Sequence, residues 1–167
     1  MSKFILIRKK IDTFKRKTLS IPGDKSISIR FILLSSLTKG RCIAFNLLKS
    51  EDVNSAIKSI RKLGIKVNLR KSYCEVYGRG LFGFRYKKNL ILDAGNSGTT
   101  ARLICSALID AEYPVKITGD ESLRSRDMKR IIKPLKLFGV KFIDSNGRLP
   151  LLIKGSKSTK AINFTEN

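Results

Sequence analysis

The sequence predicts an α/β fold, of the α+β kind, in which a βαβαββ unit repeats along the chain. Three observations predict it: an amphipathic helix with a following strand occurs twice, a more apolar helix precedes each copy, and short β-type runs separate the helices. With 167 residues, 42% of them apolar, the chain is long enough to bury a core.

The amphipathic helix and the strand after it are the clearest part of the repeat. Residues 50–67 read SEDVNSAIKSIRKLGIKV, and residues 125–142 read SRDMKRIIKPLKLFGVKF. Each copy has a Ser or Asp cap, apolar residues at helical spacing and a glycine stop, Gly64 in the first copy and Gly139 in the second. The pattern predicts two equivalent helices, each followed by a strand.

A more apolar helix precedes each amphipathic one. The two candidates are residues 26–40, SISIRFILLSSLTKG, and residues 98–111, GTTARLICSALIDA. The first stretch closes on Gly40, which predicts a helix stop there. Because helices that are apolar on most sides are usually buried, we expect these two inside and the amphipathic pair outside.

Short β-type runs between the helices complete the repeat. We expect unit one at about 15–80, unit two at about 88–155 and the start of a third unit at 156–167, all within one incomplete domain, 15–167. Residues 1–14 are interpreted as a leading strand, compatible with membership in a missing second domain. A repeat that stops in mid-unit indicates a truncated chain. The predicted strands are residues 41–48, 66–70, 73–78, 89–94, 114–119, 141–144 and 149–155.

The charge of the chain favours an anionic partner. It has 35 Lys and Arg residues against 13 Asp and Glu, a net charge of +22, which suits nucleic acid, an acidic membrane surface or phosphorylated small molecules. The basic residues are spread along the chain and aromatic residues are sparse, so a nucleic-acid groove is not favoured. No segment is apolar and long enough for a signal peptide or a membrane span, and we expect a cytoplasmic protein without a membrane partner.

Cysteine and histidine usage narrows the chemistry. The three cysteines, Cys42, Cys74 and Cys105, are far apart and odd in number, which indicates small core residues in a reducing compartment. Histidine is absent from the sequence. Its absence excludes Ser-His-Asp and Cys-His catalysis and any histidine metal site.

The motif PGDKSISIR, residues 22–30, places a turn before the first apolar helix. Asp24 or Ser26 can cap that helix. Lys25 and Ser26 add an ammonium and a hydroxyl at the helix start, and Arg30 lies one turn beyond Ser26 on the same face. Since a helix N-terminus favours anions, the motif predicts a phosphate or carboxylate site. An ordinary capped helix with solvent-facing Lys and Arg is the alternative for this motif alone.

The motif DAGNSGTTARL, residues 93–103, occupies the equivalent turn before the second apolar helix. Asn96 and Gly98 belong to a run of small residues that leaves backbone exposed, so a ligand can approach closely. Arg102 aligns with Arg30 of the first motif. An ordinary glycine-rich turn is the alternative, and neither the dinucleotide-binding nor the P-loop pattern occurs.

The motif TGDESLRSRDM, residues 118–128, combines a strand end, an acidic turn and the two arginines Arg124 and Arg126. Taken alone it also fits a surface loop with local ion pairs, which individually contribute little. Three basic or glycine-rich helix starts at matching places in two repeats favour an anion-binding site.

In this order and spacing, the three motifs resemble the signatures of the 5-enolpyruvylshikimate-3-phosphate synthase (3-phosphoshikimate 1-carboxyvinyltransferase) family. The resemblance runs from residue 18 to the end of the chain. The sister enzyme that transfers enolpyruvyl to UDP-N-acetylglucosamine is the alternative within the same fold; it has Lys-Asn where this chain has Lys25-Ser26, and a loop cysteine that is absent here.

The resemblance implies the enolpyruvyl transferase fold, an inside-out α/β barrel. Its two similar domains each contain three βαβαββ units, and the substrates bind between the domains. The chain would then be two units of one domain plus the start of a third.

The resemblance also implies the reaction. The enolpyruvyl group of phosphoenolpyruvate would be transferred to the 5-hydroxyl of shikimate 3-phosphate through a tetrahedral intermediate, with release of phosphate, on the shikimate pathway to chorismate and the aromatic amino acids. It implies no metal or organic cofactor, a monomeric intact enzyme and inhibition of that enzyme by the herbicide glyphosate. The family's Ser-Ser-Gln cluster, proton-transferring acids and further arginines would lie beyond Asn167, so we expect the 167 residues alone to be inactive.

The family pattern assigns roles to particular residues, with Lys25 as the catalytic one. It implies contacts to shikimate 3-phosphate from Lys25, Ser26 and Arg30. It implies contacts to phosphoenolpyruvate from Lys25, Asn96, the Gly98 backbone and Arg126. Arg102 is interpreted as organising the site.

Two positions depart from the family pattern. Ile29 stands where the family usually has His or Asn, and Asp127 stands where it commonly has Pro, which adds a negative charge near an anion site. Both departures predict altered affinity. A decayed relative and a non-catalytic basic module that binds polyanions are the further alternatives, the second because of the +22 charge.

Overall fold

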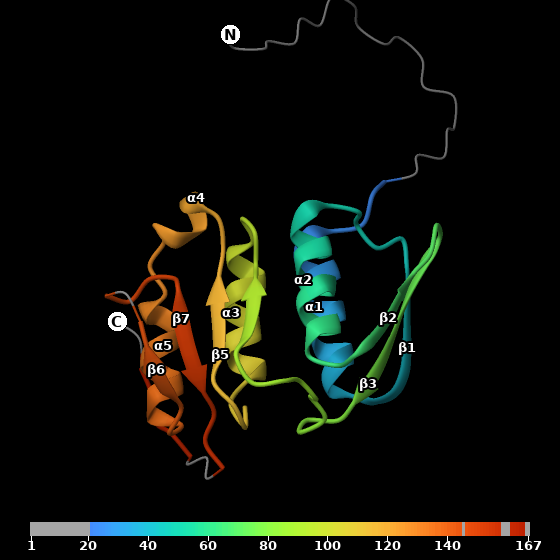
Figure 1. The fold of residues 1–167 in the computed structure, drawn as a ribbon. Coiled ribbons are helices and arrows are strands. Elements are labelled where there is room, and N and C mark those ends of the chain that lie inside the picture. The colour runs from blue at the N-terminus through green and yellow to red at the C-terminus, as the bar shows by residue number, and fades with distance from the viewer. Residues whose placement is uncertain (1–20, 145, 158–160, 166–167) are drawn as a thin grey trace, which may run out of the picture.

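The computed structural model describes residues 21–144, 146–157 and 161–165. These residues form a mixed α/β structure in which helices pack against a three-stranded and a four-stranded β-sheet (Figure 1). The leading strand expected at 1–14 and the opening of unit one at 15–20 lie outside the described residues.

The three-stranded sheet and two helices come from the first part of the described chain. Its strands are antiparallel in the order β1-β3-β2, and both α1 and α2 pack against it. The elements are α1 (Lys25–Leu37), β1 (Lys39–Phe45), α2 (Glu51–Lys62), β2 (Lys66–Leu69) and β3 (Tyr73–Arg79).

The four-stranded sheet follows, in the order β4-β5-β7-β6. The pair β4 and β5 is parallel and is connected through α3, as a parallel pair requires, whereas β7 is antiparallel to both β5 and β6. In both sheets the last strand along the chain lies between the two that precede it. The elements are β4 (Leu90–Asp93), α3 (Gly98–Ala107), β5 (Val115–Thr118), α4 (Glu121–Arg124), α5 (Lys129–Leu137), β6 (Lys141–Ile143) and β7 (Leu151–Lys154).

The helix ends follow the predicted start and stop signals. Asp24 caps α1 by accepting the Ile27 amide, and Ser50 caps α2. Gly64 and Gly139, the predicted stops of the amphipathic helices, have φ of 85° and 93°, in the left-handed region that ends helices.

Three expectations need correction. The helix expected over 26–40 ends at Leu37, because the Thr38 amide and hydroxyl both donate to the Ser35 carbonyl, and Gly40 already lies in β1. The strand expected over 41–48 ends at Phe45, since the chain turns at Asn46 with φ of 56°. In the acidic turn, residues 121–124 form the short helix α4.

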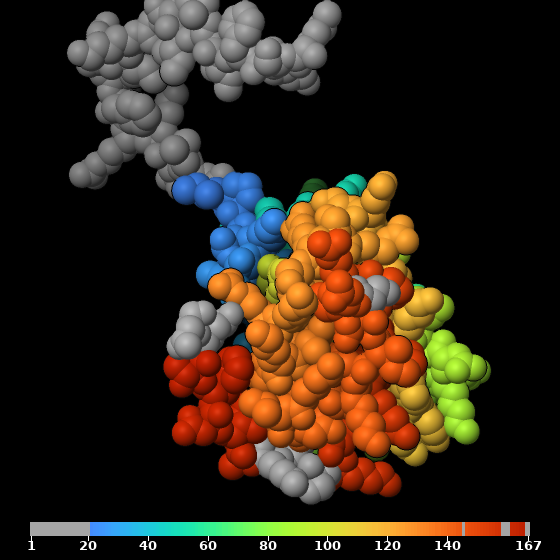
Figure 2. All heavy atoms as spheres, turned by 90° about the vertical axis from the view of Figure 1, so that its left-hand side faces the viewer, coloured from blue at the N-terminus to red at the C-terminus, as the bar shows by residue number. Residues whose placement is uncertain are grey.

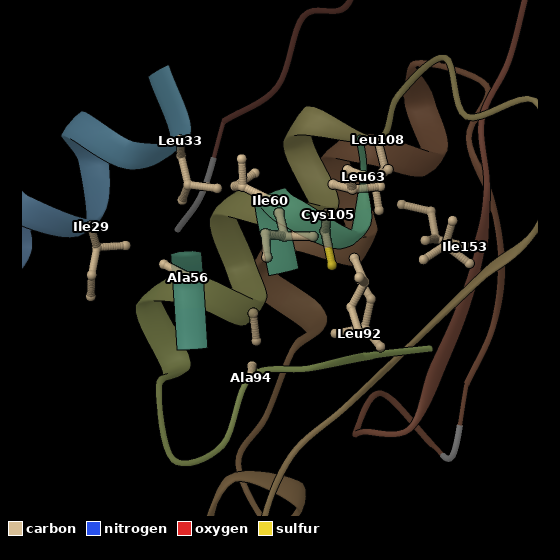
Figure 3. Close-up of a cluster of buried hydrophobic side chains, with 14 of the residues drawn as sticks. Ile29, Leu33, Ala56, Ile60, Leu63, Leu92, Ala94, Cys105, Leu108 and Ile153 are labelled. Carbon is tan, nitrogen blue, oxygen red and sulfur yellow. The ribbon is translucent and has the colours of Figure 1, made fainter. Parts of the chain in front are cut away.

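One hydrophobic core joins the two sheets with their helices (Figure 3). Ile29 of α1, Ile60 of α2, Cys105 of α3 and Ile153 of β7 are all fully buried in this cluster. Ile29 therefore faces the core, where an apolar side chain is favoured over His or Asn, and the expected effect of this departure on an anion site does not follow from its position.

The apolar helix α1 is buried on one side only. Ile32 and Leu33 lie in the core, but Ile27 is 69% exposed and Leu34 is 63% exposed. The expectation of a fully inside position was wrong for this helix in the described structure, because none of the described elements covers that face. The amphipathic α2 contributes to the core through Val53, Ala56, Ile57 and Ile60.

Within the described ranges, every helix is too short or too polar to traverse a bilayer. The three cysteines form no disulfide; Cys74 and Cys105 are buried and Cys42 is half-buried. Burial raises the pKa of the Cys105 thiol to about 12. The interpretation of Cys74 and Cys105 as core residues is therefore confirmed.

Candidate functional site

The helices α1, α2 and α3 begin at the same end of the molecule, where α4 also lies (Figure 1). Figure 2 shows this end from the side, with the residues of α4 at the upper edge and the blue start of α1 beyond them. The predicted site residues come from the first turns of α1, the turn between β4 and α3, and the loop after α4. Chain segments far apart in sequence therefore bring the three motifs to one end of the fold.

The start of α1 presents two cations to this end. Lys25 is paired with Asp52, the second residue of α2, with 2.9 Å between Nζ and Oδ2. Arg30 is exposed, and no described residue forms a hydrogen bond or ion pair with it. Ser26 is half-buried on the same turn. The buried Ser28 hydroxyl donates to the Asp24 carbonyl and accepts the Leu48 amide, so this serine supports the fold.

The start of α3 is built around Gly98. The preceding Ser97 caps the helix by accepting the Thr100 amide, and the Gly98 amide donates to the Asn96 carbonyl at 3.1 Å. A Cβ on Gly98 would lie 2.8 Å from Nη1 of Arg102 and 3.4 Å from Nη1 of Arg126. Two guanidinium groups therefore flank the first turn of a helix, whose own dipole also favours an anion.

Arg126 is held by a chain of hydrogen bonds. Its Nη2 donates to Asn96 Oδ1 at 3.0 Å, and Asn96 Nδ2 donates to Asp120 Oδ2 at 2.7 Å. Asp120 also caps α4 by accepting the Leu123 amide at 2.7 Å. The hydrogen bonds from Leu123 and Asn96 hold the pKa of the Asp120 carboxyl below its usual range. Asp120 thus stays ionised and fixes Asn96 and, through it, Arg126.

Arg102 and Asp127 meet through the backbone. Arg102 Nη2 donates to the Asp127 carbonyl oxygen at 3.0 Å, which ties α3 to the loop before α5. The Asp127 carboxylate accepts the Lys129 amide at the start of α5 and lies 3.9 Å from the Lys129 ammonium. The charge of this departure is thus engaged by α5. The prediction of altered affinity stays a prediction.

The predicted residues form two groups linked through α2. Lys25, Ser26 and Arg30 lie on α1, whereas Asn96, Gly98 and Arg126 surround the α3 start. No hydrogen bond or ion pair between described residues joins the groups directly. The link is Asp52, whose carboxylate pairs with Lys25 and whose carbonyl accepts the Thr100 hydroxyl at 3.5 Å.

A surface pocket of about 660 Å³ lies beside this link and is lined by the first turns of α2 and by residues 93–96, including Asp52 and Asn96. A pocket of about 750 Å³ near residues 45–49 and 69–73 contains none of the predicted ligands. Among the described residues, no cluster of acidic or cysteine side chains could hold a metal ion.

Sequence reasoning did not assign Asp52 and Asp120 to the site. Both carry an ordinary signal of their own, an acidic residue at a helix start, and that signal explains a cap without requiring a site. Their contacts to Lys25 and Asn96 depend on how the helices pack, which the local sequence does not encode.

The chain matches known proteins over most of its length. The family model for EPSP synthase (3-phosphoshikimate 1-carboxyvinyltransferase) matches residues 11–166. A 3-phosphoshikimate 1-carboxyvinyltransferase from Streptococcus mutans is 42% identical over 149 residues, which cover 88% of this chain and 35% of the relative. One from Ruthia magnifica is 39% identical over 164 residues, 98% of this chain and 37% of the relative.

A solved structure agrees with these relatives. The EPSP synthase of Acinetobacter baumannii superposes with a TM-score of 0.80 at 32% identity and covers 87% of this chain and 33% of its own. The chain therefore spans about a third of the length of the relatives it matches. On these matches, together with the three motifs at one end of a mixed α/β fold, the chain belongs to the EPSP synthase family.

Proposed function

We propose that this chain provides part of the substrate site of a 3-phosphoshikimate 1-carboxyvinyltransferase. The enzyme would transfer the enolpyruvyl group of phosphoenolpyruvate to the 5-hydroxyl of shikimate 3-phosphate and release phosphate. The observation that carries the proposal is the pair of guanidinium groups, from Arg102 and Arg126, that flank Gly98 at the start of α3. Phosphate and carboxylate groups are the ligands that such a site attracts most strongly.

The two groups of residues suit the two substrates. Phosphoenolpyruvate would bind at Gly98 and Arg126, with Asn96 keeping the guanidinium in place. Shikimate 3-phosphate would bind at the α1 start through Ser26 and Arg30. Lys25 would contact both, because its flexible ammonium can donate in three directions. Cations on both sides would offset the repulsion between two anionic substrates.

We propose further that catalysis needs residues outside these 167. The chain spans 35% of the Streptococcus mutans relative, and the 167 residues alone would bind substrates without turning them over. The common strand order, β1-β3-β2 in one sheet and β5-β7-β6 in the other, supports the proposal that the chain consists of repeated βαβαββ units. The intact enzyme would be a cytoplasmic monomer that glyphosate inhibits.

A polyanion-binding module is the second candidate, favoured by the net charge of +22. It predicts weak binding to any polyanion that falls steeply with salt. The UDP-N-acetylglucosamine enzyme remains the alternative within the fold, and it predicts a preference for that nucleotide sugar over shikimate 3-phosphate.

Calorimetric titration of the complete polypeptide that carries this chain separates these functions. We expect saturable binding of shikimate 3-phosphate and phosphoenolpyruvate at physiological salt, and about tenfold or greater loss of phosphoenolpyruvate affinity in Arg126→Ala. The matched control is Arg124→Ala, which removes the same charge from the neighbouring turn but leaves Asn96 and Gly98 untouched. Equal losses in both variants, or binding to any polyanion alike, would contradict the proposal.

A further inference from the structure

The ion pair between Lys25 and Asp52 points to a role for a residue outside the predicted ligand set. Nζ of Lys25 lies 2.9 Å from Oδ2 of Asp52, and the Lys25 side chain remains 56% exposed while that of Asp52 is 21% exposed. We propose that Asp52 is a positioning residue that holds the Lys25 ammonium between the two substrate subsites. This inference rests on the proposed function, because it gives the held ammonium anionic substrates to bind.

Asp52 is attached to both sides of the site. It lies in the first turn of α2, next to the Ser50 cap. Its carbonyl oxygen accepts the Thr100 hydroxyl at 3.5 Å, and Thr100 in turn is bonded to the hydroxyl and main chain of the α3 cap, Ser97. A side chain that pairs with Asp52 is therefore drawn from α1 toward the start of α3, where Gly98 and its guanidinium neighbours lie.

The chemistry of the ammonium makes this compatible with substrate binding. An ammonium has three N–H donors, and one is used by Asp52. Two remain for substrate oxygens. Without the carboxylate, the four-carbon side chain of Lys25 would sample many rotamers, and ordering it on binding would lower the affinity.

A positioning role and a purely electrostatic role predict opposite results. A carboxylate beside an anion site repels the anion, so its removal should strengthen binding if charge alone matters. If Asp52 positions Lys25, its removal should weaken binding despite the smaller repulsion. Stability does not separate the two, because a largely exposed ion pair contributes little to it.

The test is calorimetric titration of the complete polypeptide and its Asp52→Asn variant with phosphoenolpyruvate and with shikimate 3-phosphate. We expect about fivefold weaker binding of each substrate, in the range of coupling between contacting residues. Asp52→Glu, which restores the charge, should recover part of the affinity. The matched control is Glu51→Gln, which removes the same charge from the same helical turn but not from the pair with Lys25; we expect equal or slightly stronger binding.

A double-mutant cycle shows whether Asp52 acts through Lys25. Asp52→Asn should cause no further loss of affinity when Lys25 is already replaced by Met. Additive losses, or an Asp52→Asn variant that binds as tightly as Glu51→Gln, would overturn the inference while leaving the proposed function intact. A wild-type polypeptide that binds neither substrate would overturn both.

Discussion

Replacement of Gly98 by Ala tests how tightly the two guanidinium groups close over the start of α3. The added Cβ would lie 2.8 Å from Nη1 of Arg102, about 0.6 Å nearer than the 3.4 Å at which ordinary contact begins, and just at that limit from Arg126. Gly98 is not among the residues with positive φ, so alanine fits the backbone itself. The conflict is confined to the arginine side chains, and Arg102 has to move.

The magnitude follows from what that movement disturbs. Displacing Arg102 weakens its 3.0 Å hydrogen bond to the Asp127 carbonyl and shifts a cation that the proposed site uses. A charge-assisted hydrogen bond contributes about 1.5 kcal/mol or more, which corresponds to roughly tenfold weaker binding of phosphoenolpyruvate. The helix itself should not lose stability, since alanine is favoured over glycine in helices by roughly 0.5–1 kcal/mol.

The assay is titration of phosphoenolpyruvate and glyphosate into the complete polypeptide, with thermal unfolding measured on the same samples. Ser106→Ala, at the exposed far end of α3, is the control and should bind as wild type. In an Arg102→Ala background, where the nearest neighbour is gone, Gly98→Ala should add little. Wild-type affinity in Gly98→Ala, or a loss explained by unfolding, would refute the reasoning.

Three further predictions concern stability and reactivity. Ile60→Ala, at a fully buried position, should lower the free energy of unfolding by about 2–5 kcal/mol in denaturant titrations, whereas Ile43→Ala, at a 40% exposed position, should cost less than half as much; equal costs would contradict the core described above. The pKa of Asp120 is lowered by its hydrogen bonds, so the stabilisation it gives is present above the usual aspartate pKa of about 3.9 and is lost as the pH falls through the lower folded value. The difference in melting temperature between wild type and Asp120→Asn should therefore shrink between about pH 5 and pH 2, and a constant difference would argue against the cap. Cys105, whose pKa burial raises to about 12, should resist alkylation at neutral pH in the folded protein while the half-buried Cys42 reacts, as mass spectrometry of labelled peptides would reveal; modification of Cys105 first would contradict its burial.

The sequence was sufficient for the helices and strands where local signals decide them. The glycine stops at Gly64 and Gly139 and the cap at Ser50 are local chemistry, and the structure has them as expected. Gly40 misled because a glycine after a helix is also a frequent strand residue at a turn, and the Thr38 side chain ended α1 first. The burial of α1 could not be derived, since it depends on which elements cover the Ile27 and Leu34 face.

The candidate site was predictable in its motifs and not in its contacts. Helix starts attract anions wherever they occur, so Lys25, Gly98 and Arg126 were identified from local pattern and resemblance. The hydrogen-bond chain through Asp120 and the ion pair with Asp52 depend on tertiary packing between helices far apart in the sequence. Ile29 was misjudged for the same reason, because the helical face on which a residue lies decides whether it meets a ligand or the core.

The most direct test of the account is the reaction itself in the complete polypeptide. Incubation with phosphoenolpyruvate and shikimate 3-phosphate should yield equal amounts of phosphate and of shikimate 3-phosphate enlarged by one enolpyruvyl group, and Lys25→Ala should abolish both. Mass spectrometry of the products together with a phosphate assay measures this. Absence of product from a folded polypeptide that binds both substrates would contradict the proposed transfer, and product formation unaffected by Lys25→Ala would contradict the site.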